Sequence, residues 1–416
     1  SENVALPLKT WHGKHEFAFG GGYSRRAFEG SSSSHPVQLL RSDGSLAERI
    51  GFSGSGKMSA DDDEFVLFAQ DHWEVSEDLA FDLGMRYLAE SLGSGRNFAP
   101  RVGAVFFPKG NGKTVLRAGL GVFNNHAPLL AGDFSQNPVR SVTFFSPTGE
   151  VVGSPLVYQN LYEHLKDESG SFFSPTHTQT TPYNVTWSLE ADRQLWPKAT
   201  VRFSFLSSRS HNQFVVRPIP DSPTGPALVL SPTGATNYHE FESTLHLRPT
   251  AASEWNLSYV FSSARGNMNA FSQVYMPFEQ PVIRPDAYSY LPADVPHRLI
   301  TWGRFKTHLW GILASPLIDW HSGFHYSIVD EYQNYVGEPN RFRFPRFFSL
   351  DLKLSKEFHL PFPWIKKHLM RGSLAILNVT NNSNPRDVYN NVTSPFFGHF
   401  VGLQHRFLDT NLTILY

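Results

Sequence analysis

The sequence contains no cysteine among its 416 residues. Secreted soluble domains of eukaryotes are often held by disulfides, so this absence disfavours an extracellular sandwich of that kind. Net charge is nearly absent too, because 36 Lys and Arg residues balance 37 Asp and Glu residues. This balance gives no basis for binding to nucleic acid or to an anionic membrane surface.

Long apolar runs are also missing. No run reaches the 18 or so apolar residues of a transmembrane helix. No signal peptide is present either, which indicates a mature, processed or truncated chain. The signatures GxSxG, HExxH and the P-loop do not occur, and the 18 histidines are scattered. We therefore predict no enzyme activity, no cofactor and no metal site.

Aromatic residues, in contrast, are abundant. They make up 14% of the chain and include 35 Phe, whereas charged residues account for only 18%. Soluble proteins usually carry about a quarter of charged residues. Low charge with many aromatic side chains suits an outer-membrane barrel, in which half of each strand is polar and aromatic girdles lie at both membrane interfaces.

The clearest pattern is an alternation of apolar and polar side chains in residues 65–123, which contain four strand-length runs. In one run a single face carries five apolar residues: Leu79, Phe81, Leu83, Met85 and Tyr87. The other face carries Asp82, Gly84 and Arg86. This period of two predicts strands, because successive side chains of a strand point to opposite faces. The block alone fits a membrane barrel with its apolar face toward lipid and, equally, a soluble antiparallel sandwich with that face inward.

The lengths of the connections distinguish these two folds. We count about 14 strands, and every second connection is long: residues 25–63, 125–182, 209–238, 264–296, 324–345 and 381–405. A sandwich has no reason to sort its loops by end, whereas outer-membrane barrels combine short periplasmic turns with long extracellular loops. The sequence therefore predicts an all-β fold, a transmembrane antiparallel β-barrel, with a local hairpin near residues 139–146 inside the longest loop.

Five segments resemble one family. They are FAQDHWEVSEDLAFDLGMRY (68–87), NFAPRVGAVFFPKGNGKTVLRAGLGVF (97–123), NVTWSLEADRQLWPKATVRFSFLSSRSHN (184–212), ADVPHRLITWGRF (293–305) and LAILNVTNNSNPRDV (374–388). Their order and content are similar to those of TonB-dependent outer-membrane receptors. The resemblance is greatest to the Oar-like group, which has a carboxypeptidase-regulatory-like domain and abounds in Acidobacteria. Each motif is loose, but five in the same order are specific.

The resemblance implies a 22-stranded barrel with an N-terminal plug, energised through TonB. The whole chain, residues 1–416, is expected to be the C-terminal part of such a barrel, with the plug and about eight strands before it. It also implies location in the outer membrane of a Gram-negative bacterium. The expected partners are outer-membrane lipid, the TonB complex if an upstream plug exists, and an unknown ligand on the extracellular loops; no nucleic acid is expected.

Two sets of residues are candidate site residues. The first set would line the lumen, either as a basic ladder that guides an anionic solute or as partners of acids such as Asp82 and Glu190: Arg86, Arg101, Arg117 and Arg298. The second set would anchor the barrel at the membrane interfaces: Trp73, Trp196, Trp310 and Tyr416.

Three functions remain open at this point. A receptor for a bulky ligand follows from the ordered motifs. A porin-like passive channel of about 14 to 16 strands follows from the even strand count and the lack of a plug in this sequence. A structural barrel that presents partner-binding loops follows from the long irregular stretch at residues 124–182.

Overall fold

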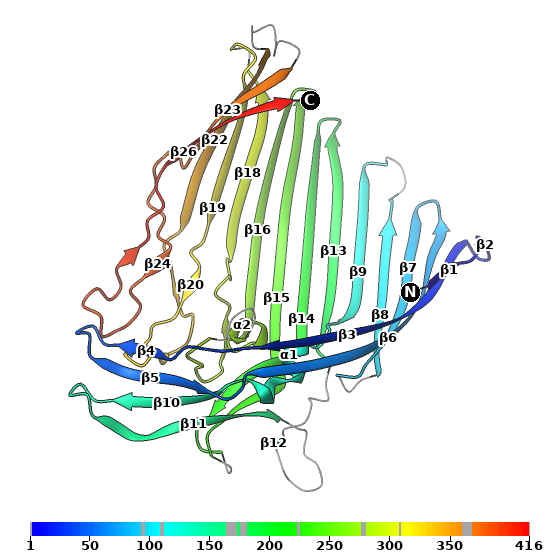
Figure 1. The fold of residues 1–416 in the computed structure, drawn as a ribbon. Coiled ribbons are helices and arrows are strands. Elements are labelled where there is room, and N and C mark those ends of the chain that lie inside the picture. The colour runs from blue at the N-terminus through cyan, green and yellow to red at the C-terminus, as the bar shows by residue number, and fades with distance from the viewer. Residues whose placement is uncertain are drawn as a thin grey trace.

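The computed structural model describes residues 2–92, 96–108, 112–163, 173–174, 181–222, 225–275, 280–307, 309–359 and 368–415. Fourteen antiparallel strands form one curved wall (Figure 1), each paired with its neighbours in chain order. They are β3 (Lys14–Ser31), β6 (Lys57–Ser76), β7 (Leu79–Glu90), β8 (Arg96–Phe106), β9 (Thr114–Asn124), β13 (Tyr183–Trp196), β14 (Ala199–Ile219), β15 (Ala227–Thr250), β16 (Ser253–Asn267), β18 (His297–Lys306), β19 (Leu313–His321), β22 (Phe347–His359), β23 (Leu369–Leu377) and β26 (Phe407–Leu415). The predicted barrel-type sheet and its count of about 14 strands are confirmed.

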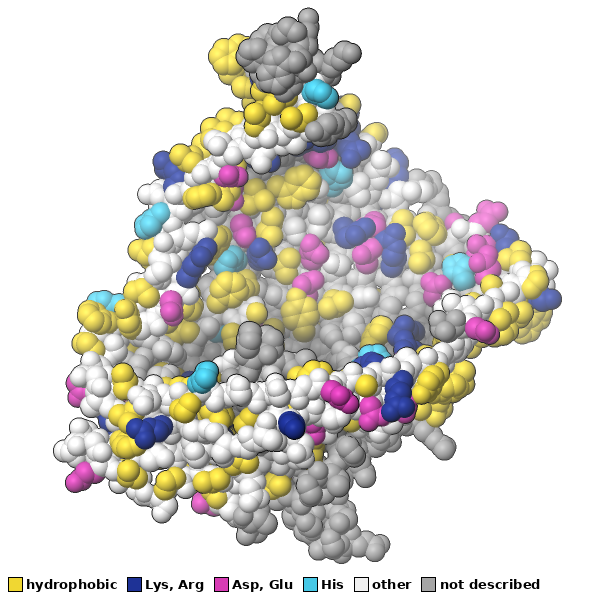
Figure 2. Space-filling model, in the orientation of Figure 1, with side chains coloured by type: hydrophobic (Ala, Val, Ile, Leu, Met, Phe, Trp, Pro, Cys, Tyr) yellow, Lys and Arg dark blue, Asp and Glu magenta, His cyan; other side chains and the backbone are white. Residues whose placement is uncertain are grey.

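The described part of this wall is an open arc. At one edge, β26 pairs with β23 and with no other described strand. At the other edge, β3 pairs with β6 and with two short strands, β1 (Glu2–Ala5) and β2 (Lys9–Thr10). The two edges therefore do not meet within the described residues, and Figure 2 shows the hollowed inner face that the arc encloses.

The two faces of the wall differ because the strands are in register. Leu189, Phe205 and Phe241 are cross-strand neighbours in one row. The next residues along, Glu190, Ser204 and Glu242, form an adjacent row on the opposite face. Leu189 is 52% exposed and Phe241 is 40% exposed, so the apolar rows are open to the surroundings of the sheet. This is the arrangement of a barrel whose outer face meets lipid and whose inner face is polar.

The remaining elements form a layer of loops at the end of the wall where the long connections lie (Figure 1). Their strands are β4 (Val37–Leu40), β5 (Leu46–Ser53), β10 (Val139–Phe145), β11 (Val151–Glu163), β12 (Phe173–Ser174), β17 (Tyr288–Tyr290), β20 (His325–Tyr326), β21 (Phe342–Arg343), β24 (Asp387–Val388) and β25 (Phe400–Val401). Their helices are α1 (Leu129–Gly132), the 3-10 turn η1 (Phe134–Gln136) and α2 (Phe271–Val274). No helix of the described residues is long and apolar enough to cross a membrane.

In two of the expected loops the wall strands themselves continue far past their predicted ends, which corrects the sequence analysis. Residues 25–63 were expected to be irregular, but β3 and β6 stay paired from Arg25↔Asp63 to Ser31↔Lys57. Likewise β14 and β15 stay paired up to Ile219↔Ala227. The first of these extensions carries charged cross-strand neighbours in place of apolar alternation, such as the ion pair between Arg25 and Asp61 at 3.0 Å. The predicted hairpin near residues 139–146 is confirmed as β10 and β11.

The loop layer has a hydrophobic core of its own. Phe134 is fully buried, and its ring lies 6.0 Å from that of Tyr162, 6.1 Å from that of Phe271 and 5.3 Å from that of Tyr275. These residues come from two separate connections, residues 125–182 and 264–296, so their packing holds the two loops together as a soluble domain holds its elements. The wall needs no such core, because lipid covers its apolar face.

The substitution Phe134→Ala tests this division. We expect it to destabilise the loop layer by on the order of 3 kcal/mol, since it leaves a cavity among buried rings. Hydrogen–deuterium exchange should become faster in β10 and β11 and stay unchanged in β18 and β19. The matched variant Phe203→Ala removes a ring from the outer face, where it is 45% exposed, and should leave the loop layer unchanged. Equal acceleration in β18 and β19 would contradict a separate core.

Candidate functional site

The inner face of the wall carries a network of ion pairs in the middle of the sheet. Register places Glu190 directly opposite Arg117 and Asp192 directly opposite Arg202. Asp192 joins both arginines, with Arg117 Nη1 at 2.6 Å from Oδ2 and Arg202 Nε at 2.6 Å from Oδ1. Arg117 also contacts Glu190. In Figure 2 basic and acidic side chains accordingly adjoin one another on the inner face.

The other predicted lumen residues share this face but differ in their contacts. Arg298 is paired with Asp319 at 2.9 Å. Arg86 Nη2 lies 3.8 Å from Glu64 Oε1. Arg101 lies over the ring of Phe123, with 4.6 Å from its guanidinium carbon to the ring centroid.

The sequence left two roles open for these arginines: a basic ladder that guides an anionic solute, or partners of acids such as Asp82 and Glu190. Arg117 meets Glu190, one of the two acids named there, whereas Asp82 pairs with His72 at 2.7 Å instead of with an arginine. Sequence reasoning missed Asp192 and Arg202. The alternation of the sequence could have identified Asp192 and Arg202, because each occupies a polar-face position of its strand. A role for the four arginines in guiding solute stays a prediction.

A recess of about 410 Å³ indents the inner face beside this network. Its floor consists of glycines on three adjacent strands, and its border includes His72, Asp82, Arg101 and Ser188. Side chains in place of these glycines would fill it: a Cβ on Gly103 would lie 3.4 Å from Asp82 Cβ, and one on Gly119 would lie 3.2 Å from Ser188 Oγ. The recess offers a cation, a hydroxyl and an imidazole–carboxylate pair to a polar group.

The loop layer is tied across the arc by Arg41. Its side chain is nearly buried and donates from Nε to Glu331 Oε2 at 2.9 Å, and from Nη2 to the carbonyl oxygen of Phe145 at 2.6 Å. These contacts join the first, second and fifth long connections of the sequence. The loops therefore form one connected surface.

Glu48 lies in the same layer, next to Arg140 and Tyr158 around a cavity of about 80 Å³. The residue is only 5% exposed, and burial raises the pKa of its carboxyl group to about 7. Burial penalises the charged form, so the carboxyl group of Glu48 loses its proton only as the pH rises through about 7.

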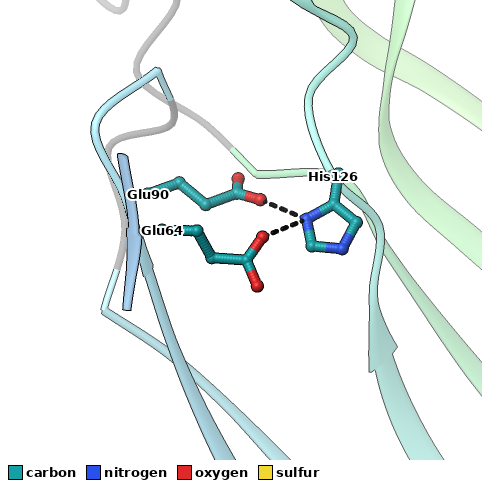
Figure 3. Close-up of side chains that lie close together, drawn as sticks. All are labelled: Glu64, Glu90 and His126. Atoms are coloured by element: carbon teal, nitrogen blue, oxygen red, sulfur yellow. Dashed lines mark hydrogen bonds and ion pairs between the residues drawn. The ribbon is translucent and has the colours of Figure 1, made fainter. Parts of the chain in front are cut away.

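The residues that could hold a metal lie at the loop end of β6 and β7 (Figure 3). Glu64 and Glu90 are cross-strand partners, and His126 approaches them from the segment after β9. His126 Nδ1 lies 2.8 Å from Glu90 Oε1 and 3.0 Å from Glu64 Oε2. The sequence analysis predicted no metal site, and among the described residues this is the one group of three or more such donors in reach of a single ion.

The sequence of this barrel matches a known protein family. The family model described as "Outer membrane beta barrel domain" matches residues 90–311, which is more than half of the chain. The chain belongs to this outer-membrane β-barrel family. Comparison with the curated protein sequences gives no match.

Solved receptor structures share the fold of the barrel. The outer membrane transporter YddB from Escherichia coli has a TM-score of 0.64 at 16% identity, over 99% of this chain and 53% of its own. The ferric enterobactin receptor PfeA from Pseudomonas aeruginosa gives 0.60 at 13% identity, over 99% and 52%. The siderophore receptor PirA from Acinetobacter baumannii gives 0.61 at 12% identity, over 99% and 53%. The chain spans about half the length of these proteins.

Three of the predicted membrane anchors lie at the short-turn end of the barrel wall. Trp73 stacks on His15 with 5.4 Å between ring centroids. Trp196 ends β13 and is half-exposed, and Trp310 protrudes from the turn between β18 and β19 with 75% of its surface exposed. Their anchoring role at the periplasmic interface stays a prediction. Tyr416 lies outside the described residues.

The raised pKa of Glu48 predicts a pH dependence of the loop layer. A carboxyl group whose pKa is higher in the folded state adds stability at low pH, which is lost as the pH rises through about 7. The amides of β5 and β10, corrected for intrinsic exchange, should therefore be better protected at about pH 5 than at about pH 8. Glu48→Gln should remove the difference, and Glu150→Gln, in the exposed turn between β10 and β11, should keep it. An unchanged difference in Glu48→Gln would contradict the assignment.

Proposed function

We propose that this chain is the C-terminal part of the barrel of a TonB-dependent receptor, which imports a bulky ligand bound by the extracellular loops. The observation that carries the proposal is the open arc of 14 strands: among the described residues β26 pairs on one side only, and the outer edge of β3 is covered only in part, by the short strands β1 and β2. In lipid, each unsatisfied backbone group costs several kcal/mol, so such edges must be covered. Additional strands, as in receptors about twice this length, would cover them.

The ordered motifs support the assignment to the Oar-like group. Residues 68–87 fall on the β6–β7 hairpin, residues 97–123 on the β8–β9 hairpin and residues 184–212 on the β13–β14 hairpin. Residues 293–305 include most of β18, and residues 374–388 join the end of β23 to β24. The first four motifs thus lie on the wall, and the fifth leads from β23 into the loop layer, in the order of the resemblance.

The loop layer supports the binding of a bulky ligand. Arg41 and the ring cluster around Phe134 hold several loops in one surface at the open end of the barrel. A surface built from several loops on a rigid scaffold is suited to a large ligand, because distant contacts are fixed relative to one another. The similar ferric enterobactin receptor PfeA has a structure in complex with enterobactin.

The same open arc argues against the passive channel. A pore formed by this chain alone needs pairing between β3 and β26, and the described part of β26 pairs with β23 only. The receptor proposal avoids this requirement, because strands outside this chain would complete the ring.

Two measurements on the protein isolated from outer membranes test the proposal. A receptor should bind the purified periplasmic domain of TonB in a pull-down assay, and it should conduct few ions in planar bilayers because the plug fills its lumen. A TonB domain with a scrambled sequence, which cannot fold into its binding site, serves as the control in the pull-down assay. Stable, open conductance without TonB binding would contradict the receptor and favour the passive channel.

A further inference from the structure

The cluster of Glu64, Glu90 and His126 has more negative charge than its hydrogen bonds satisfy. Both carboxylates face the same nitrogen, His126 Nδ1, at 3.0 and 2.8 Å. A ring nitrogen carries at most one proton, so a single N–H is shared between two acids. One N–H group cannot fully satisfy the hydrogen-bonding capacity of two carboxylates.

Glu90 makes this deficit clear. Its side chain has no exposed surface, and its second oxygen, Oε2, is buried without a hydrogen-bond partner among the residues that the structure describes. Buried polar atoms are nearly always satisfied, and each exception calls for an explanation such as a bound ion. The deficit thus points to a ligand that the cluster is built to hold.

Nearby cations do not remove the deficit. Arg26 Nη2 is 3.7 Å from Glu90 Oε1, and Arg86 Nη2 is 3.8 Å from Glu64 Oε1. Both distances exceed that of a hydrogen bond. Arg26 instead bonds Asp62, a fully buried acid that also accepts from the backbone N–H of Leu92 at 3.0 Å. The two arginines limit the net charge without reaching the carboxylates.

We propose that Glu64, Glu90 and His126 bind a divalent transition-metal cation, for which zinc is the best match. This site goes beyond the proposed function and does not depend on it. The three ligand atoms lie within 4.8 Å of one another, so one ion can reach all of them.

The donor set selects the class of metal. Calcium and magnesium prefer oxygen ligands alone, whereas an imidazole together with carboxylates suits zinc and its neighbours. Ligand atoms around tetrahedral zinc are roughly 3.4 Å apart. The present nitrogen–oxygen distances of 2.8 and 3.0 Å therefore need to open by roughly half an ångström, which the partly exposed His126 ring can supply.

A metal here would fasten a loop to the wall. Glu64 and Glu90 belong to β6 and β7, whereas His126 begins the segment that leads into α1 and Phe134. Zinc would replace a shared proton with three coordinate bonds between these segments. Three protein ligands also leave a fourth position for water or for a group of an external molecule.

Zinc titration of the detergent-purified protein by calorimetry, after treatment with a chelator, tests the site. The expected result is one high-affinity equivalent per chain, weakened at least about tenfold in His126→Ala and in Glu90→Gln, since each removes a ligand. His72→Ala is the matched control: His72 is as exposed as His126 but faces a single carboxylate, Asp82. It should keep wild-type affinity.

Hydrogen–deuterium exchange and competition with calcium test the same site in two further ways. Hydrogen–deuterium exchange of the segment after β9 should slow with zinc in the wild type and in His72→Ala, and not in His126→Ala. Calcium should not compete at equal concentration. The proposal would be overturned by absence of zinc binding, by unchanged affinity in both His126→Ala and Glu90→Gln, or by calcium binding as tight as zinc binding. Because TonB plays no part in the assay, none of these results bears on the receptor proposal.

Discussion

Backbone hydrogen bonding in lipid is the constraint on which the rest of the structure depends. The hydrocarbon core offers no water, so every N–H and C=O of a spanning strand must pair with a neighbouring strand. The long ladders satisfy this demand, for example between β14 and β15 from Ala199↔Leu247 to Ser210↔Thr236. Once the ladders fix the register, each side chain is assigned to the lipid face or to the inner face, and the chemistry of both faces follows.

The inner-face ion pairs are a consequence of that register. Arg117, Glu190, Asp192 and Arg202 meet because their strands are aligned, and Asp192 sits between two arginines. Beyond the lipid the constraint disappears, and a different principle takes over. There the loops pack around buried rings such as Phe134, as in a soluble domain. The molecule therefore combines a wall ordered by hydrogen bonds with a loop layer ordered by burial.

The wall was predictable from the sequence because its rule is local. An alternation of two residues appears in any short window, as in Leu79 to Tyr87, and the sorting of loop lengths distinguishes a barrel from a sandwich. The polar extensions of β3 and β6 were missed because they lack apolar alternation. The Glu64, Glu90 and His126 cluster was missed for another reason: its members are far apart in the sequence, and only the register and the path of the loop bring them together.

The most direct test of the central claim is site-directed spin labelling along β13, since the chain has no cysteine that would interfere. Single cysteines at Thr186, Trp187, Ser188 and Leu189 would be labelled in lipid vesicles, and their accessibility to oxygen and to a water-soluble nickel complex compared. The account predicts high oxygen accessibility at Trp187 and Leu189 and low oxygen accessibility at Thr186 and Ser188. Protection of Trp187 and Leu189 from both reagents would instead place the apolar face in a protein core and contradict the membrane barrel.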